Sequence, residues 1–273
     1  MKIEKKTNVR IAVAKDKAFC FYYKDSFETS VSSGIYPYVS RVGYSGYNPT
    51  LSINTEETLS PLGLGMMTTP VDSGELLEAV STSSSDIGNI VIVQVLDEEG
   101  LERNCMAVLS GTTPVPLLDI KTNQPVPISR VNAVVNRGST ATTGDVLIRQ
   151  QGDGTVFSGF KAEDQRSFNL LFTIPSNKKG LFLPSESSIN RSAGSDSYAI
   201  IRVKSRIKDG LWLNSSRWGL QQKGTSAFLF ETYDRPLLPP FTDIMVTAQS
   251  SVSGVDVTGR IPIQLVSKTF GNN

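Results

Sequence analysis

The chain has 273 residues, of which 39% are hydrophobic, and its formal net charge is +1. This length can bury one large core or two smaller ones, and the balanced charge does not indicate a general nucleic-acid-binding surface. Histidine is absent, which excludes Ser/His/Asp and Cys/His catalytic groups and histidine-ligated zinc. Carboxylates are present, but no pair has a sequence setting that would separate their pKa values. Asp145, Asp243 and Asp256 could ligate a hard cation, but no EF-hand-like spacing supports such a site. We therefore expect no enzyme activity, no bound metal and no cofactor.

Residues 1–34 are predicted to form a basic N-terminal arm that contains a strand pair over 10–14 and 18–23. A charge run of this kind is usually solvated surface, and the alternative is an arm that contacts an acidic partner or nucleic acid. The charged N-terminal residues are not followed by the apolar region and cleavage site of a signal peptide, and no apolar stretch is long enough to span a membrane. We therefore predict neither a secretory signal nor a membrane-spanning segment. Cys20 and Cys105 each lie in an apolar run and are predicted to be buried thiols.

The segment Arg10–Asp25, RIAVAKDKAFCFYYKD, resembles the opening of the glutaminase half of cobyrinic acid a,c-diamide synthase. The amphipathic helix expected next is replaced by a stretch rich in Gly, Tyr and Ser. That family also needs a later cysteine with a histidine, and this chain has no cysteine after Cys105. We interpret this likeness as a coincidence.

Residues 35–59 combine tyrosines with glycines and prolines, a composition typical of an ordered loop. We predict a loop that packs on its own domain, and the alternative is a surface that binds a neighbouring chain or a glycan. The candidate contact residues of this segment are Tyr36, Tyr38, Tyr44, Tyr47 and Pro49.

Residues 87–150 are predicted to be an antiparallel β unit. Ile90–Leu96 is a β-branched run with both faces largely apolar, and Asp97–Gly100 follows as a turn. The chain returns through 104–109, so this segment predicts a β-hairpin. Residues 130–136 and 145–149 are predicted to form a second β-hairpin around glycine-containing turns.

Residues 42–139 contain several short sequence motifs in succession. They are VGYSGYNPTL from Val42, EETL from Glu56, STSSSD from Ser81, VLDEEG from Val95, LSGTTPV from Leu109 and SRVNAVVNRGS from Ser129. Their order and spacing are similar to those of a family of virion proteins of tailed bacteriophages, common in marine phages. The likeness covers 42–149, with a weaker continuation over 172–183. Val95 stands where that family has Gly, and Ser110 where it has Asn.

The second half predicts further strands. GDGTVFSGF at 152–160 is interpreted as a tight turn between two strands rather than a phosphate-binding loop, because no GK[ST] follows. The strand at 198–208 carries a row of Arg and Lys, which we expect to be answered by acidic groups nearby. Trp212 and Trp218 are expected to be core anchors, and exposed together they would form a stacking platform for a sugar or protein.

Together these patterns predict an all-β chain, an antiparallel β-sandwich of jelly-roll type, with one large or two smaller domains. The predicted boundaries are 1–34 for the arm, 35–150 for the first β-domain, and 151–273 for a second domain or the second half of the same sandwich. The phage resemblance implies a structural component of the virion, assembled in the host cytoplasm. Capsid decoration is the first hypothesis, and a tail- or fibre-associated module that binds a receptor or glycan is the alternative.

The expected partners are other virion proteins, such as major capsid or tail subunits, and further copies of the chain in a homotrimer. The trimer is inferred by analogy with phage decoration and fibre proteins. A host-surface glycan is the partner in the alternative hypothesis. Neither a membrane nor a specific nucleic acid is expected.

Overall fold

The computed structural model describes residues 38–64, 73–152, 154–190, 197–208, 210–221, 225–228 and 237–267. Within these ranges there is no helix, and the strands form four sheets in which every strand pair is antiparallel. The predicted all-β fold with an antiparallel sandwich is therefore confirmed. The predicted arm with its two strands and Cys20 lies outside the described residues, and so does the candidate contact residue Tyr36.

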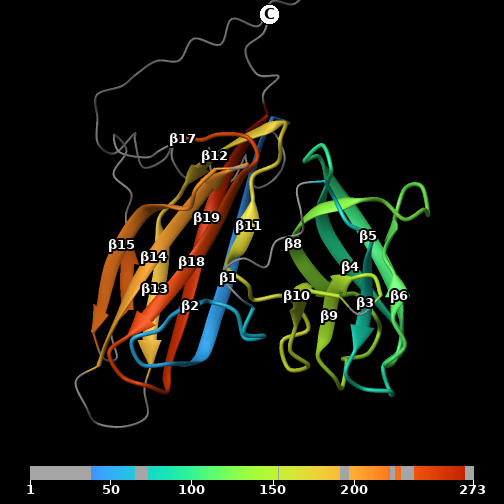
Figure 1. Ribbon diagram of the computed structural model, residues 1–273, viewed down its shortest axis with the longest axis horizontal. Coiled ribbons are helices and arrows are strands. Elements are labelled where there is room, and N and C mark those ends of the chain that lie inside the picture. The colour runs from blue at the N-terminus through green and yellow to red at the C-terminus, as the bar shows by residue number, and fades with distance from the viewer. Residues whose placement is uncertain are drawn as a thin grey trace, which may run out of the picture.

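Two sheets form a large sandwich, on the left of Figure 1. Sheet A contains β1 (Val39–Leu51), β12 (Lys178–Phe182), β13 (Ser185–Asn190), β16 (Thr225–Phe228), β17 (Leu237–Leu238) and β19 (Val255–Ser267). Sheet B contains β2 (Glu56–Thr58), β11 (Leu171–Thr173), β14 (Tyr198–Ile207), β15 (Leu213–Gln221) and β18 (Thr242–Ser250).

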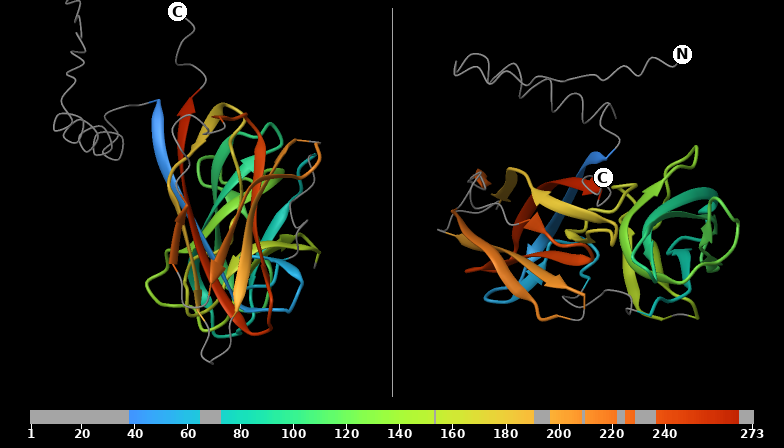
Figure 2. Two further views of the ribbon diagram at one scale, coloured as in Figure 1. Left: turned by 90° about the vertical axis from the view of Figure 1, so that its left-hand side faces the viewer. Right: turned by 90° about the horizontal axis from the view of Figure 1, so that it is seen from above.

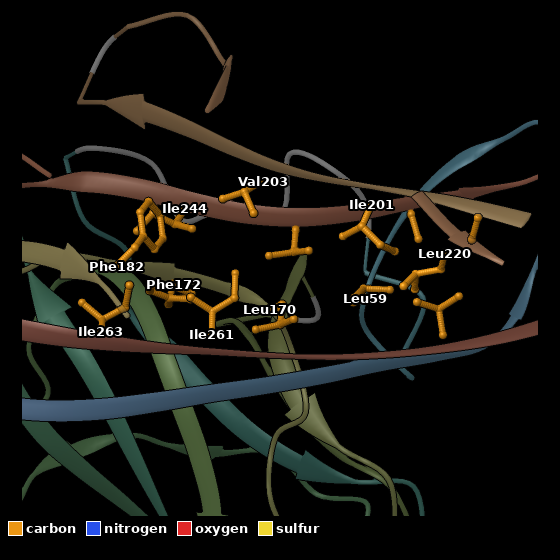
Figure 3. Packing of buried hydrophobic residues seen from close by; sticks show 14 of the residues in the cluster. Leu59, Leu170, Phe172, Phe182, Ile201, Val203, Leu220, Ile244, Ile261 and Ile263 are labelled. Carbon is orange, nitrogen blue, oxygen red and sulfur yellow. The ribbon is translucent and has the colours of Figure 1, made fainter. Parts of the chain in front are cut away.

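The core of the large sandwich comes from strands whose alternate side chains are apolar. In β19, Val257, Ile261 and Ile263 are buried and Gly259 faces the same core, whereas Thr258, Arg260 and Pro262 lie on the outer face. Ile201 and Val203 of β14 point from sheet B toward Ile261 and Ile263, as Figure 3 shows. Burial of these side chains against one another holds the two sheets face to face.

Two further sheets form a small sandwich beside the large one (Figures 1 and 2). Sheet C contains β4 (Ile87–Asp97), β5 (Glu102–Ser110), β7 (Leu118–Asp119) and β8 (Ile128–Asn136). Sheet D contains β3 (Leu77–Ser81), β6 (Val115–Pro116), β9 (Val146–Gln150) and β10 (Val156–Phe160). Its separate core is built on Val91, Val93 and Val95, all fully buried.

The small sandwich is inserted between two parts of the large one. β1 and β2 precede it in the chain and β11–β19 follow it, yet β1 pairs with β19 from Val39↔Val266 to Leu51↔Val255. The strand pairing thus divides the chain elsewhere than at the predicted boundaries of 35–150 and 151–273. Those boundaries assumed that neighbours in sequence share a core, whereas here the first described strand pairs with the last.

The predicted hairpin at 90–109 is confirmed as β4 and β5, joined by a turn with Gly100 at φ 75°. The tight turn at 152–160 is confirmed as well, because β9 and β10 pair across it. Strands also form at 128–136 and 146–150, but they do not make the second hairpin that we predicted. β8 pairs with β4 in sheet C, and β9 pairs with β3 and β10 in sheet D.

The segment predicted as a loop at 35–59 contains β1, one of the two longest strands. Gly46 fits a crowded strand rather than a turn. A Cβ on Gly46 would lie 2.5 Å from the carbonyl oxygen of Leu59 and 2.9 Å from that of Phe168. Only glycine permits so close an approach of three backbone segments. The turn-like composition of this stretch therefore reflects packing against sheet B.

Candidate assembly surfaces

The candidate tyrosines have different environments. Tyr38 is 45% exposed at the start of β1. Tyr44 packs on the large core with its ring stacked on Phe172, centroids 3.8 Å apart, and burial raises its pKa. The Tyr47 hydroxyl donates a hydrogen bond to Asp164 Oδ2 at 2.8 Å, and burial together with this bond raises its pKa. Tyr38, Tyr44 and Tyr47 do not form one exposed aromatic surface, although Pro49 is exposed.

The two tryptophans are both half-buried but lie in different settings. Trp218 packs against the large core, and its indole N–H donates to Ser187 Oγ at 2.7 Å. Trp212 lies beneath the guanidinium of Arg206, 4.8 Å from the ring centroid. One ring thus supports the sandwich and the other is covered by an arginine, so the pair does not form a shared stacking platform.

The basic row on β14 is answered by carboxylates, as expected from the sequence. Lys204 Nζ lies 2.6 Å from Glu56 Oε1, and Arg206 Nη2 lies 2.6 Å from Asp243 Oδ2. Glu56 also accepts from Thr247 Oγ1 at 2.5 Å. Burial alone would raise the pKa of Glu56, but the contacts with Lys204 and Thr247 outweigh it and lower that pKa. Lys204 and Arg206 therefore each have a carboxylate partner within the fold.

A polar junction joins the two sandwiches. Arg130 of β8 and Asp243 of β18 form a buried ion pair with Nε–Oδ1 at 2.7 Å. Asn132 of β8 exchanges two hydrogen bonds with Thr173 of β11, at 2.8 and 3.0 Å. Buried and directional bonds of this kind fix the angle between the two bodies as well as their contact.

The serine-rich bend at 81–86 is anchored by a buried carboxylate. Asp86 accepts hydrogen bonds from Ser81 Oγ at 2.5 Å, from the Thr143 N–H at 2.7 Å and from the Gly144 N–H at 3.0 Å. Burial would raise the pKa of Asp86, but these hydrogen bonds outweigh it and hold the pKa below its usual value. The bend is thus a structural clamp between the loops that flank sheet D.

The outer face of sheet C exposes a row of apolar side chains, which we call the sheet C face: Ile87, Ile90, Ile92, Met106 and Val108. Ile90 and Val108 lie opposite each other on β4 and β5 and are 37% and 48% exposed, and Ile87 is 72% exposed. The sequence indicated apolar residues on this face, because the predicted strand at 90–96 is apolar on both sides. Its exposure could not be seen without the fold.

A groove of about 320 Å³ lies between the two sandwiches. One wall is the segment 42–45 of β1, the other is formed by the outward side chains Gln94, Ala133 and Val135 of sheet C, and Arg166–Asn169 lines it as well. Arg137 and Arg166 border it and are both exposed. Sequence reasoning missed this groove because its walls come from segments about 90 residues apart.

Reactive groups are sparse in the described ranges. Cys105 is a free thiol buried in the small core, as predicted, and burial raises its pKa to about 12. No group of three or more Cys, Asp or Glu side chains placed to hold a metal is found among the described residues. No helix in this part of the chain is long and apolar enough to span a membrane.

Comparisons with known proteins give little further guidance. No protein-family model and no curated protein matches the chain. Among solved structures, the VP2 subviral particle of infectious bursal disease virus aligns over 85% of this chain and 73% of the other, with 9% identity and a TM-score of 0.25. The Gx strain of the same virus aligns over 84% and 77%, with 10% identity and a TM-score of 0.23.

Proposed function

We propose that this chain is a structural subunit of a tailed-bacteriophage virion, attached to the capsid as a decoration protein and without catalytic activity. The sheet C face carries this proposal. Exposed apolar side chains that gather on one side of a sheet mark a surface that binds another protein. The order of sequence motifs over 42–149 resembles that of phage virion proteins, which indicates that the partner is another virion protein.

The two-sandwich architecture supports the same role. A subunit that holds its place by contact must present its surfaces at fixed relative angles, and the buried junction of Arg130 with Asp243 joins the two bodies rigidly. The clamped bend around Asp86 stiffens the loops at the edge of the small sandwich in the same way. Both contacts make the arrangement of the surfaces more rigid.

Cosedimentation tests the proposal directly. Capsids assembled without this chain are mixed with the purified chain and pelleted, and we expect the chain to pellet with them. Ile90→Asp combined with Val108→Asp places charges on the sheet C face and is expected to weaken binding at least tenfold. Leu211→Asp is the matched control, since Leu211 is 84% exposed on the large sandwich.

A chain that stays in the supernatant with capsids but pellets with purified tails would contradict decoration and support the tail-associated alternative. Binding that is equal for the double variant and the control would remove the sheet C face from the interface. We further propose that the chain acts as a homotrimer. Sedimentation-equilibrium centrifugation measures its mass, and a monomer at assembly concentrations would contradict that part.

A further inference from the structure

β1 is an edge strand of sheet A, and its free edge lines the groove between the sandwiches. β1 pairs with β19 and with no other named strand. The N–H of Ser267 donates to the carbonyl oxygen of Tyr38 at 2.9 Å, which sets the phase of this ladder. In an antiparallel pair alternate residues bond across the ladder, so the main-chain groups of Gly43 and Ser45 point away from β19.

These main-chain groups have no partner in the part of the chain that the structure describes. Gly43 and Ser45 both line the groove, so their N–H and C=O groups are available to a molecule that enters it. Unpaired groups on a strand edge are a template for another strand. An extended peptide that pairs with such an edge obtains its affinity from main-chain hydrogen bonds.

The positive charge at the groove favours an acidic peptide. Arg137 and Arg166 border the groove, and no Asp or Glu is among the residues that line it. The guanidinium of Arg166 lies 4.6 Å from the ring centroid of Phe168, a contact that holds it at the groove. Arg166 also experiences the charge of Asp164, which is hydrogen-bonded to Tyr47. The exposed Arg137 and Arg166 favour a carboxylate on the entering chain.

The opposite wall is suited to a strand as well. Ala133 and Val135 of β8 present small and β-branched side chains to the groove. A bound strand directs alternate side chains to opposite sides, so one set can contact this apolar wall while the other reaches the arginines. An extended, alternating segment with acidic residues fits both requirements.

We propose that the groove binds an extended acidic segment of a neighbouring virion subunit, which adds as a strand to the free edge of β1 at Gly43 and Ser45. This inference rests on the proposed virion role for the identity of the neighbour. The site itself is defined by the edge, the two arginines and the apolar wall.

Fluorescence anisotropy with the full chain tests the site. The probe is a labelled peptide TEVEVT, capped at both ends, and TKVKVT is its charge-reversed control. We expect TEVEVT to bind at least tenfold more tightly than TKVKVT. Binding of neither peptide, or equal binding of both, would overturn the proposal.

Variants of the edge and of the arginines separate the two contributions. Ser45→Pro removes an N–H that faces away from β19, so the β1–β19 ladder stays intact while strand addition is blocked. We expect at least a tenfold loss of TEVEVT binding with an unchanged urea midpoint. Arg137→Glu with Arg166→Glu changes only exposed side chains and should cause a similar loss. Arg217→Glu on β15, also exposed, should change nothing.

Hydrogen exchange gives an independent measurement. The amides of Gly43 and Ser45 should exchange rapidly in the free chain and at least tenfold more slowly with saturating TEVEVT. Unchanged exchange in the presence of bound peptide would place the peptide elsewhere and contradict the site. A chain lacking residues 1–37 that binds TEVEVT much more tightly would show that its own N-terminal residues occupy the groove, which also overturns the proposal.

Failure here and failure of the virion role give different results. If the groove variants leave capsid cosedimentation unchanged and no peptide binds, only the strand-addition site is lost. If the chain binds TEVEVT but never pellets with a phage structure, the groove remains a peptide site and the virion role is lost.

Discussion

The carboxylate of Asp243 is shared by two arginines, Arg130 from the small sandwich and Arg206 from its own sheet. Arg130 approaches with Nε–Oδ1 at 2.7 Å and Nη2–Oδ2 at 3.1 Å, and Arg206 with Nη2–Oδ2 at 2.6 Å. Thr173 Oγ1 donates to the same carboxylate at 2.6 Å. One carboxylate therefore binds an arginine from each side of the junction.

Asp243→Ala should destabilise the chain strongly. The change leaves Arg130, whose side chain is 2% exposed, as a buried charge without its carboxylate. Breaking a buried pair from one side costs about 3–5 kcal/mol. The free energy of unfolding, measured by urea titration, should fall by this amount. Lys161→Ala is the control, because the Lys161–Asp145 pair is about one-third exposed and should contribute at most about 1 kcal/mol. Equal losses in the two variants would refute the role of the junction.

Gly46→Ala should destabilise the large sandwich. The added Cβ would lie 2.5 Å from the Leu59 oxygen, 2.8 Å from the Leu170 nitrogen and 2.9 Å from the Phe168 oxygen, all backbone atoms. Overpacking of this kind typically costs about 1–3 kcal/mol. Gly219→Ala is the matched control, since a Cβ there has nothing within 4 Å. Thermal melts of both variants decide the point, and a stable Gly46→Ala protein would argue against the close approach of β1 to sheet B.

Asp86→Asn should remove a pH-dependent part of the stability. The pKa of Asp86 is lower in the folded chain than its ordinary value of 3.8, so the carboxylate stabilises the fold above that value. This contribution is lost as the pH falls below 3.8 toward the folded pKa. The difference in unfolding free energy between the wild type and Asp86→Asn should be about 1–3 kcal/mol at pH 7 and should shrink below pH 4.

Urea titrations at several pH values measure this difference. Glu98→Gln serves as the control, because it is the same kind of acid-to-amide substitution at an exposed position, in the β4–β5 turn. A difference for Asp86→Asn that stays constant down to pH 3 would show that the ionised carboxylate is not what holds the bend.

Cys105 should report the opening of the small sandwich. Its side chain is fully buried, and burial raises its pKa to about 12, so the thiol is both inaccessible and almost entirely un-ionised at pH 8. In a Cys20→Ser chain, the remaining thiol should be inert to a disulfide reagent under native conditions and react fully in urea. Rapid reaction without denaturant would contradict a closed core around this residue.

Strands with local signals were predictable from the sequence. The apolar run at 90–96, the turn at Asp97–Gly100 and the return to 109 form a hairpin because pairing between sequence neighbours needs no long-range information. The basic row on β14 was also interpreted correctly, since balanced charge implies acidic partners nearby. The acidic partners themselves, Glu56 and Asp243, could not be named, because both come from strands far from β14 in sequence.

Long-range pairing was beyond the sequence. Nothing in GYSGYNP shows that this stretch pairs with β19, and its glycines suggested a loop because Gly46 is required by neighbours that only the fold brings together. The groove was missed for the same reason, because Gly43 and Val135 belong to different sandwiches. The candidate contacts Trp212 and Trp218 were chosen for their residue type, while exposure, which decides contact, depends on the finished sheets.

The insertion of one sandwich within another has a consequence for biosynthesis. On the ribosome, β1 and β2 emerge before the small sandwich but cannot complete their sheets until β18 and β19 have been translated, because these strands are their partners. The intervening residues 75–160 contain all eight strands of the small sandwich. The small sandwich can therefore fold during translation, whereas β1 and β2 remain without their partner strands until β18 and β19 have been synthesised.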